Sequence, residues 1–373
     1  MHGVWRDGNR FQLLAESSCF LPAMFDAIEE ARHSILIELY LMESGRLTTA
    51  LLDALTRAAE RGVRVALMLD GYGAMGLAGE DRQRIEAAGI ALRLFNPLGF
   101  HSLARNLTRD HRKVVVVDGR VAFTGGFGAV DEFLSAWYEV AVRIEGPVVA
   151  DWVRLFSRLW DSPMTRGEGS PALVREVGLS LTEREDYRGM RGRVVWGQGY
   201  RYQAIRHSLY GRVSSAQRRI WLCTPYFVPT FSLRLRLVRA ARRGVDVRLL
   251  LPGKDHDHPG VRYAGQRFYR RMLKAGVRIF EFEPSFIHAK FTLADNWSSL
   301  GSCNFDHWSL HWNLEANQEV DDGRFAGEVA ALFERNFSAS REITRQEWAR
   351  RPRWQRVKEW IFGRVDAWLT RLR

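Results

Sequence analysis

The amino-acid sequence predicts an α/β protein built from two duplicated halves. The main observation is a repeated motif, His-x-Lys followed after four residues by Asp and then by a glycine-rich turn. It occurs at His111, Lys113 and Asp118 and again at His288, Lys290 and Asp295. The segments before each copy also match, alternating apolar strands with helices that end at glycine. This order is typical of a sheet covered on both faces, and so long a repeat indicates a domain pair. We expect pseudo-twofold symmetry with one active site at the interface.

The expected elements of the first half follow one another as strand, helix and strand. Residues 11–17 predict a strand, residues 21–32 a helix, and the next strand ends at Tyr40. An amphipathic helix at 44–61 follows, and a later strand at 137–142 leads to a helix that ends near Trp160. The second half repeats this order: 31–42 matches 216–228, 58–70 matches 240–252, and 87–97 matches 274–284.

These limits divide the chain into four parts. Residues 1–160 form the first half and residues 194–340 the second. Between them, residues 161–193 lose periodicity and are rich in Gly, Pro, Ser and charge, as expected for a connector. Residues 341–373 remain as an amphipathic C-terminal helix.

The composition indicates an anionic partner. The net charge of +12 suits phospholipid headgroups or nucleic acid, although an arginine-rich background without function would give the same charge. The three cysteines are widely spaced, so they predict neither a disulfide framework nor a metal site, and they suit a reducing cytosol. No N-terminal signal peptide and no run of about 18 apolar residues is visible, so we expect a soluble or peripheral protein without a transmembrane helix.

The paired motifs suit phosphodiester transfer. That reaction needs a nucleophile, an acid for the leaving alkoxide, and positive charge on the phosphoryl oxygens. Residues two apart on a strand face the same side, so each motif presents an imidazole beside an ammonium. The two histidines supply attack and proton transfer, while Lys113 and Lys290 hold the phosphoryl oxygens. Asn304 and Ser302 could donate hydrogen bonds to the same oxygens, and neither metal nor cofactor is required.

Two glutamates at matching positions are candidates to orient the histidines. A histidine that attacks phosphorus needs an acceptor on its other ring nitrogen. Glu139 follows His111 by 28 residues and Glu315 follows His288 by 27, each on a later strand. A surface charge on a strand is the alternative for either residue alone, but the matching offsets favour a role in orientation.

The doubled motif resembles the phospholipase D superfamily, and the resemblance covers roughly residues 10–340. Residues 224–229 (TPYFVP) and the run from Asn304 to Asn317 are similar to bacterial cardiolipin synthases, above all to their short form without transmembrane helices. The resemblance implies two α/β/α sandwich halves of the phospholipase D type, with His111 as the nucleophile and His288 as the acid and base; the symmetry of the sequence alone leaves the two roles interchangeable.

The family motif also includes Asp118 and Asp295, but each stands just before a turn, which favours a structural role as a turn cap. One departure concerns the glycine turn, which in the family usually carries Ser or Asn in both halves. Here Gly128 stands where the second half has Asn304, so the first half lacks that side-chain donor.

The function that this resemblance implies is a phosphatidyltransferase. It would attack phosphatidylglycerol, form a phosphatidyl-histidine and pass the phosphatidyl group to the hydroxyl of a second phospholipid, giving cardiolipin and glycerol. The expected location is the cytoplasmic face of the bacterial inner membrane, with the membrane surface as partner. A phospholipase D that releases phosphatidic acid, a nuclease and a non-catalytic scaffold are the alternatives; no nucleic-acid module is recognisable, so a nucleic-acid partner is disfavoured. The acceptor lipid, acyl preference and oligomeric state stay open.

Two further segments suggest contact with lipid. In the tail, apolar residues recur at three- and four-residue steps between arginines, which is typical of an interfacial membrane helix; docking on the protein's own core or on a second subunit is the alternative. The loop at 98–110 is ten residues longer than its counterpart at 285–287. It is either a lid whose Phe100, Leu103 and Arg105 contact lipid or a plain surface loop.

Overall fold

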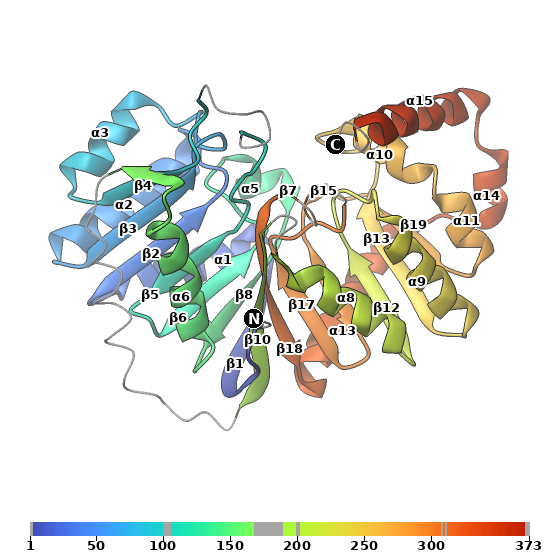
Figure 1. Cartoon of the computed structure of the whole chain (residues 1–373), viewed down its shortest axis with the longest axis horizontal. Coiled ribbons are helices and arrows are strands. Elements are labelled where there is room, and N and C mark those ends of the chain that lie inside the picture. Colours follow the sequence, from blue (N-terminus) through green and yellow to red (C-terminus); the bar gives the residue numbers. More distant parts are fainter. Residues whose placement is uncertain are drawn as a thin grey trace.

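The computed structural model describes residues 3–99, 106–167, 189–198, 202–306, 309 and 312–369. Two α/β halves stand side by side, each with a sheet between layers of helices (Figure 1). The predicted fold class, two duplicated α/β halves, is confirmed.

The sheet of the first half has its parallel strands in the middle. Its order is β9-β4-β3-β2-β5-β6-β8-β1, in which β2, β3 and β4 are parallel and the other pairs antiparallel. The bounds are β1 Arg6–Ala15, β2 Ser34–Leu39, β3 Arg64–Asp70, β4 Ala91–Phe95, β5 Val114–Val117, β6 Val121–Gly125, β8 Val140–Glu145 and β9 Thr165–Gly167. Every residue of β2 is buried, as expected for a strand covered on both faces.

The second half repeats this order as β19-β14-β13-β12-β16-β17-β18-β10. Its strands are β10 Met190–Gln198, β12 Arg219–Cys223, β13 Asp246–Pro252, β14 Arg278–Phe282, β16 Phe291–Ala294, β17 Trp297–Gly301, β18 Leu314–Asp321 and β19 Ser340–Glu342. A short β11 (Tyr202–Gln203) pairs with β10. Because β1 pairs with both β8 and β10, the two sheets join along β1.

Four helices of each half occupy equivalent positions, namely α1 and α8, α2 and α9, α3 and α11, and α6 and α13. The first half has α1 Ser17–Glu29, α2 Arg46–Glu60, α3 Gly79–Ala87, α5 Glu132–Ser135 and α6 Val149–Trp160; the second has α8 Ala204–Ser215, α9 Phe231–Arg242, α10 Pro259–Gln266, α11 Tyr269–Lys274 and α13 Gly323–Ser338. Alternate residues of β2 face opposite layers, so that Ile35 and Ile37 join the core under α1 and α2 while Leu36 joins the core with α6. That second core also takes in α13, so it is shared between the halves.

Several expected boundaries differ from the structure. The first strand begins five residues earlier than expected, at Arg6, and the first helix spans Ser17–Glu29 rather than 21–32. The connector expected at 161–193 contains β9 and the start of β10; residues 168–188 lie outside the described part.

The C-terminal segment forms α14 (Arg345–Arg350) and α15 (Arg353–Leu369). A capping box at Thr344 and Glu347 starts α14. α15 lies against α10 along the top of the second half (Figure 1). None of the described helices combines the length and apolar character needed to cross a membrane.

Candidate active site

Short parallel strand pairs between the halves position both histidines. In one, β7 (Trp137–Tyr138) pairs with β15 (Phe286–Ile287), and the amide of His288 donates to the Tyr138 carbonyl at 2.8 Å. In the other, Asp110 pairs with Leu314, and the amide of His111 donates to the Leu314 carbonyl at 2.9 Å. Each histidine therefore lies beside the residue that precedes a glutamate of the opposite half.

Because of this arrangement, each histidine pairs with the glutamate of the opposite half. Nδ1 of His111 lies 2.9 Å from Glu315, and Nδ1 of His288 lies 2.8 Å from Glu139. Both carboxylates are about 1% exposed or less. The sequence offsets run within one half, whereas the contacts run between halves, so each histidine is oriented by a residue of the other half.

The lysines lie behind and beside the imidazoles. The Lys113 ammonium donates to the His111 carbonyl at 2.5 Å and lies 5.2 Å from the Tyr40 ring centroid. Lys290 Nζ lies 2.9 Å from the His288 ring nitrogens and 3.9 Å from Glu139. The His-x-Lys part of each motif stands directly before β5 or β16 rather than within the strand. Lys113 lines the cavity, whereas Lys290 is buried behind His288 and does not.

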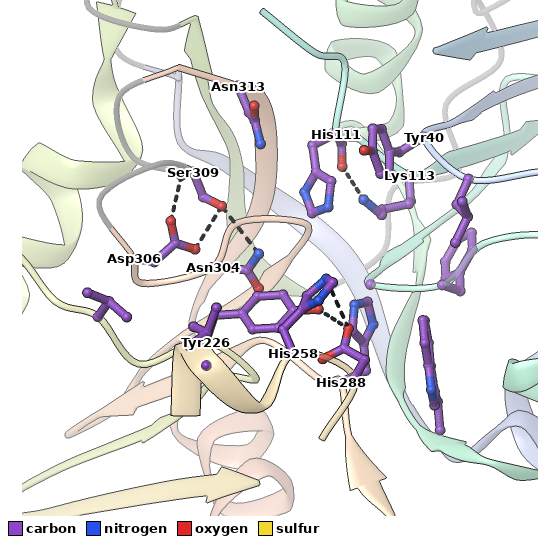
Figure 2. Close-up of a pocket in the computed structure, with 18 of the residues that line it drawn as sticks. Tyr40, His111, Lys113, Tyr226, His258, His288, Asn304, Asp306, Ser309 and Asn313 are labelled. Carbon is purple, nitrogen blue, oxygen red and sulfur yellow. Dashed lines mark hydrogen bonds and ion pairs between the residues drawn. The ribbon is translucent and has the colours of Figure 1, made fainter. Parts of the chain in front are cut away.

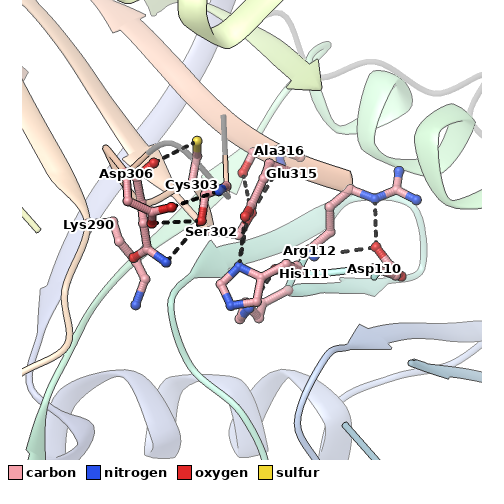
Figure 3. Close-up of polar contacts among 12 residues, drawn as sticks. Asp110, His111, Arg112, Lys290, Ser302, Cys303, Asp306, Glu315 and Ala316 are labelled. Carbon is pink, nitrogen blue, oxygen red and sulfur yellow. Dashed lines mark hydrogen bonds and ion pairs between the residues drawn. The ribbon is translucent and has the colours of Figure 1, made fainter. Parts of the chain in front are cut away.

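The Ser302 side chain points to a glutamate rather than into the cavity. Its hydroxyl donates to Glu315 at 2.5 Å, so it holds the carboxylate that orients His111 (Figure 3). It is fully buried and not among the residues that line the cavity, so the expectation that it donates to a phosphoryl oxygen does not fit this geometry. In the first half the equivalent residue is Gly126, where an added Cβ would stand 2.3 Å from Glu139. With the Glu139 carboxylate in this position, a side chain at residue 126 would displace it.

Asn304 faces the cavity from the second glycine turn. Its Nδ2 donates to Ser309 Oγ at 3.2 Å, and Ser309 donates to Asp306 at 3.0 Å (Figure 2). Its Oδ1 is buried without a hydrogen-bond partner. At the matching position a Cβ on Gly128 would meet the Leu41 carbonyl oxygen at 2.9 Å, so the first half has no space for an asparagine there.

Asp118 and Asp295 lie at turns away from the cavity. Each has a φ of about 50° and accepts three backbone hydrogen bonds, Asp118 from residues 32–34 and Asp295 from residues 217–219. Burial opposes ionisation of Asp295, but these hydrogen bonds prevail and lower its pKa. Both residues tie the turn after the motif to the strand beside it, and neither contacts the histidines.

The cavity between the halves has a volume of about 790 Å³, within the usual range for ligand sites. His111 and Lys113 enter it from one half and His288 from the other (Figure 2). Trp137 stacks on the His288 ring with centroids 4.8 Å apart, and Tyr40 meets the His111 ring edge-on at 4.9 Å. Apolar walls and a polar patch form most of the remaining lining. The walls are Leu41, Phe127, Phe133, Val228, Val261, Ala264, Phe362 and Val365, and the polar patch is Glu43, Tyr226, Asp257, His258, Asp306, Ser309 and Asn313.

Burial and the neighbouring cations shift the pKa values of the site. Burial, followed by the charges of both lysines, lowers the pKa of both His111 and His288 well below the usual value. Burial also lowers the pKa of Lys113 to about 7 and that of Lys290 to about 8, and raises that of Glu315 to about 8. The imidazoles are therefore held neutral, and a bound anion would restore the charge of the lysines.

Some residues of the site carried no clear signal in the sequence. Arg112, the middle residue of the first His-x-Lys, is buried and pairs with Asp110 at 3.1 Å (Figure 3) and with Glu38 at 2.8 Å. The middle residue of the second motif is Ala289, so nothing in the repeat marked Arg112. Trp137 could have been found, because it stands two residues before Glu139 and so shares its face of the strand.

Other expected contacts lie outside the described residues, namely those of Phe100, Leu103 and Arg105 in the long loop. Within the part of the chain that the structure covers, no group of three or more His, Cys, Asp or Glu side chains could hold a metal ion.

Comparison with known proteins decides the family. A family model described as cardiolipin synthase, PLD-like domain, matches residues 24–160 and 209–337, one match in each half. The chain belongs to this family. It is 34% identical to cardiolipin synthase B of Escherichia coli K12 over 86% of the chain and 78% of that protein, and 32% identical to cardiolipin synthase A of Serratia proteamaculans over 95% and 74%. Phosphatidylserine synthase of Haemophilus influenzae shares the fold, with a TM-score of 0.75 at 13% identity over 96% of the chain and 94% of that structure. The chain is thus an enzyme of the phospholipase D type.

Proposed function

We propose that this chain is a phosphatidyltransferase that makes cardiolipin from phosphatidylglycerol, with a second phospholipid as acceptor. The observation that carries the proposal is the cavity between the halves, where two histidines, each held by a buried glutamate, stand with Lys113, while Lys290 is buried behind His288. The cardiolipin synthases among its relatives support the lipid substrate.

In the first step, Nε2 of His111 attacks phosphorus, and the bond from phosphorus to the headgroup oxygen breaks. His288 gives its proton to the departing glycerol. Burial and the lysine charges lower the pKa of both imidazoles, which favours the neutral form of His111, and the bound phosphodiester anion acts against that shift at His288. Lys113 and Asn304 are in position to stabilise charge on the phosphoryl oxygens.

In the second step, His288 takes the proton of the acceptor hydroxyl, whose oxygen attacks phosphorus and releases His111. Two molecules of phosphatidylglycerol then give one cardiolipin and one glycerol. Glu139 and Glu315 act as positioning residues, since each fixes one imidazole and stabilises its charged form. The assignment of His111 as nucleophile follows the family pattern.

The apolar walls of the cavity favour a lipid acceptor over water, because they exclude solvent from the phosphatidyl-histidine. The three cysteines form no disulfide, which fits a reducing compartment. We therefore place the enzyme at the cytoplasmic face of the bacterial inner membrane, as a peripheral protein.

The test is incubation of the purified protein with phosphatidylglycerol vesicles, with the products read by mass spectrometry. We expect cardiolipin and glycerol from the native protein, no product from His111→Ala or His288→Ala, and native activity from His207→Ala, which removes an exposed imidazole on α8. Phosphatidic acid alone would make the protein a hydrolase. Cleavage of nucleic acid without any lipid product would overturn the lipid substrate.

A further inference from the structure

Large apolar side chains are exposed almost entirely at one edge of the described protein. Six of the twelve lie on α15: Trp354, Val357, Trp360, Ile361, Phe362 and Val365. Four more lie in loops that follow β3 and β4 in the first half, and one begins α9: Tyr72, Met75, Leu98, Leu107 and Phe231. The twelfth, Val4, belongs to the N-terminal end, which lies near β10 and well away from α15 (Figure 1).

α15 uses much of its polar face to bind the protein. Glu359 is 4% exposed and forms an ion pair with Arg351 at 2.7 Å, and Gln355 donates to Gln266 of α10 at 3.2 Å. Arg267 donates to the carbonyl of Gly363. An ordinary surface helix turns its apolar face inward. Here these polar contacts and the stacking of Phe362 on Tyr263 of α10, with ring centroids 5.8 Å apart, hold the helix in place, while the rest of its apolar stripe stays outside.

Cations flank this exposed stripe. Arg353, Arg356, Lys358 and Arg364 are all exposed. The Lys358 ammonium lies 4.9 Å from the Trp354 ring centroid, and the Arg364 guanidinium carbon 5.5 Å from that of Trp360. A stripe of tryptophan between cations fits the headgroup region of an anionic bilayer. A second copy of this helix would instead bring like charges together across a twofold interface.

The stripe is continuous with the cavity. Phe362 and Val365 are 37% and 47% exposed, and both also line the cavity that contains the histidines. In the first half, the loop after β3 is hydrogen-bonded to the residues that follow β2, since the Met42 amide donates to the Gly73 carbonyl at 3.3 Å. Leu41, the neighbour of Met42, lines the cavity from that side. Exposed apolar groups thus stand beside the cavity in both halves.

We propose that α15, together with the loop that carries Tyr72 and Met75, is a docking surface for an anionic phospholipid bilayer. It holds the mouth of the cavity against the membrane. The acyl chains of the substrate then lie along Phe362 and Val365 while the phosphate reaches the histidines; this last clause rests on the proposed function.

The test compares membrane binding with chemistry. Flotation with vesicles of phosphatidylethanolamine and phosphatidylglycerol measures binding, and turnover of a monomeric short-chain phosphatidylglycerol measures chemistry away from any surface. The variants are Trp354→Glu with Trp360→Glu, neither of which lines the cavity, and Met75→Glu in the other half. Val4→Glu is the matched control, because Val4 is 63% exposed, as is Trp360.

We expect the double variant to lose vesicle binding by about tenfold or more and Met75→Glu to lose it by less, because fewer apolar groups are removed. Val4→Glu should bind as the native protein does, and all should turn over the monomeric lipid at the native rate. Binding should weaken at high salt.

Undiminished flotation of the double variant would refute the docking surface. If light scattering then showed that the variant had changed its oligomeric state, the stripe would be an interface between two copies of the chain. Vesicle binding without turnover of any lipid would leave the docking surface standing and refute the transferase; turnover without vesicle binding would do the reverse.

Discussion

The exchange of glutamates between the halves gives a sharp prediction for Glu139→Gln and Glu315→Gln. The amide keeps the size of the carboxylate and its hydrogen bond to the imidazole, but it removes the negative charge that stabilises the imidazolium. The matched control is Glu319→Gln. Glu319 lies on β18 with Glu315 and is as deeply buried, but it pairs with Arg193 at 2.7 Å rather than with a histidine.

The magnitude follows from burial and distance. Glu139 lies 2.8 Å from Nδ1 of His288 and is fully buried. At an effective dielectric constant of about 20, unit charges about 4 Å apart attract by about 4 kcal/mol. Because the amide still holds the ring in place, we expect kcat to fall by about 10²–10³-fold in Glu139→Gln. Burial raises the pKa of Glu315 to about 8, so its carboxyl is only partly ionised at neutral pH and its replacement should cost less.

The assay is the initial rate of cardiolipin formation between pH 6 and 9. A carboxyl with a pKa of about 8 is protonated below that pH, so ionisation of Glu315 should make kcat/KM of the native protein rise on the acid side of its profile. Loss of charge on Lys113 and Lys290, with pKa values of about 7 and 8, should then make it fall. Glu315→Gln should lack this rise. Glu319→Gln should lower the melting temperature and leave kcat within about threefold, because loss of a buried ion-pair partner is a stability effect. Native rates in both Glu139→Gln and Glu315→Gln, or an equal loss in the control, would refute the orienting role.

Three further predictions concern other parts of the structure. Binding of inorganic phosphate at pH 8 should be accompanied by proton uptake, because an anion raises the lowered pKa values of Lys113 and Lys290. Calorimetry in buffers of different ionisation enthalpy measures the protons taken up, and proton release would contradict the prediction. Asp118→Asn and Asp295→Asn should each lower the free energy of unfolding by about 1–3 kcal/mol with little change in kcat, as denaturant titration would show; unchanged stability would contradict the turn role. Gly128→Asn should lower the melting temperature and fail to raise activity, because its side chain has no space; a gain in activity would contradict that view.

The sequence predicted the architecture because the signals for it are local and doubled. Strand and helix patterns, the glycines after the helices and the two motifs each repeat at matching positions, and the sheets follow from them. The meeting of both motifs in one cavity also follows from the repeat. The partner of each glutamate could not be found in this way, because offsets within one half carry no information about β7 crossing to β15.

The roles of Ser302 and of α15 depend on tertiary packing. Sequence places Ser302 beside Asn304, but only the fold turns its hydroxyl towards Glu315. The periodicity of the tail correctly divides it into an apolar and a polar face. Which face lies against the protein depends on the groups that the neighbouring elements present to it: Gln266 and Arg267 bind polar groups of α15, and the Tyr263 ring stacks on Phe362.

The crossed pairing of histidine and glutamate has a consequence for how the gene can change. Either half alone holds one imidazole and the carboxylate that serves the other, so a separated half contains no complete pair. The other copy therefore cannot compensate for a mutation that removes a histidine or glutamate from one copy. Two independent copies could compensate for each other. The repeat, once fused around a single cavity, ceases to be redundant, and both copies come under selection together.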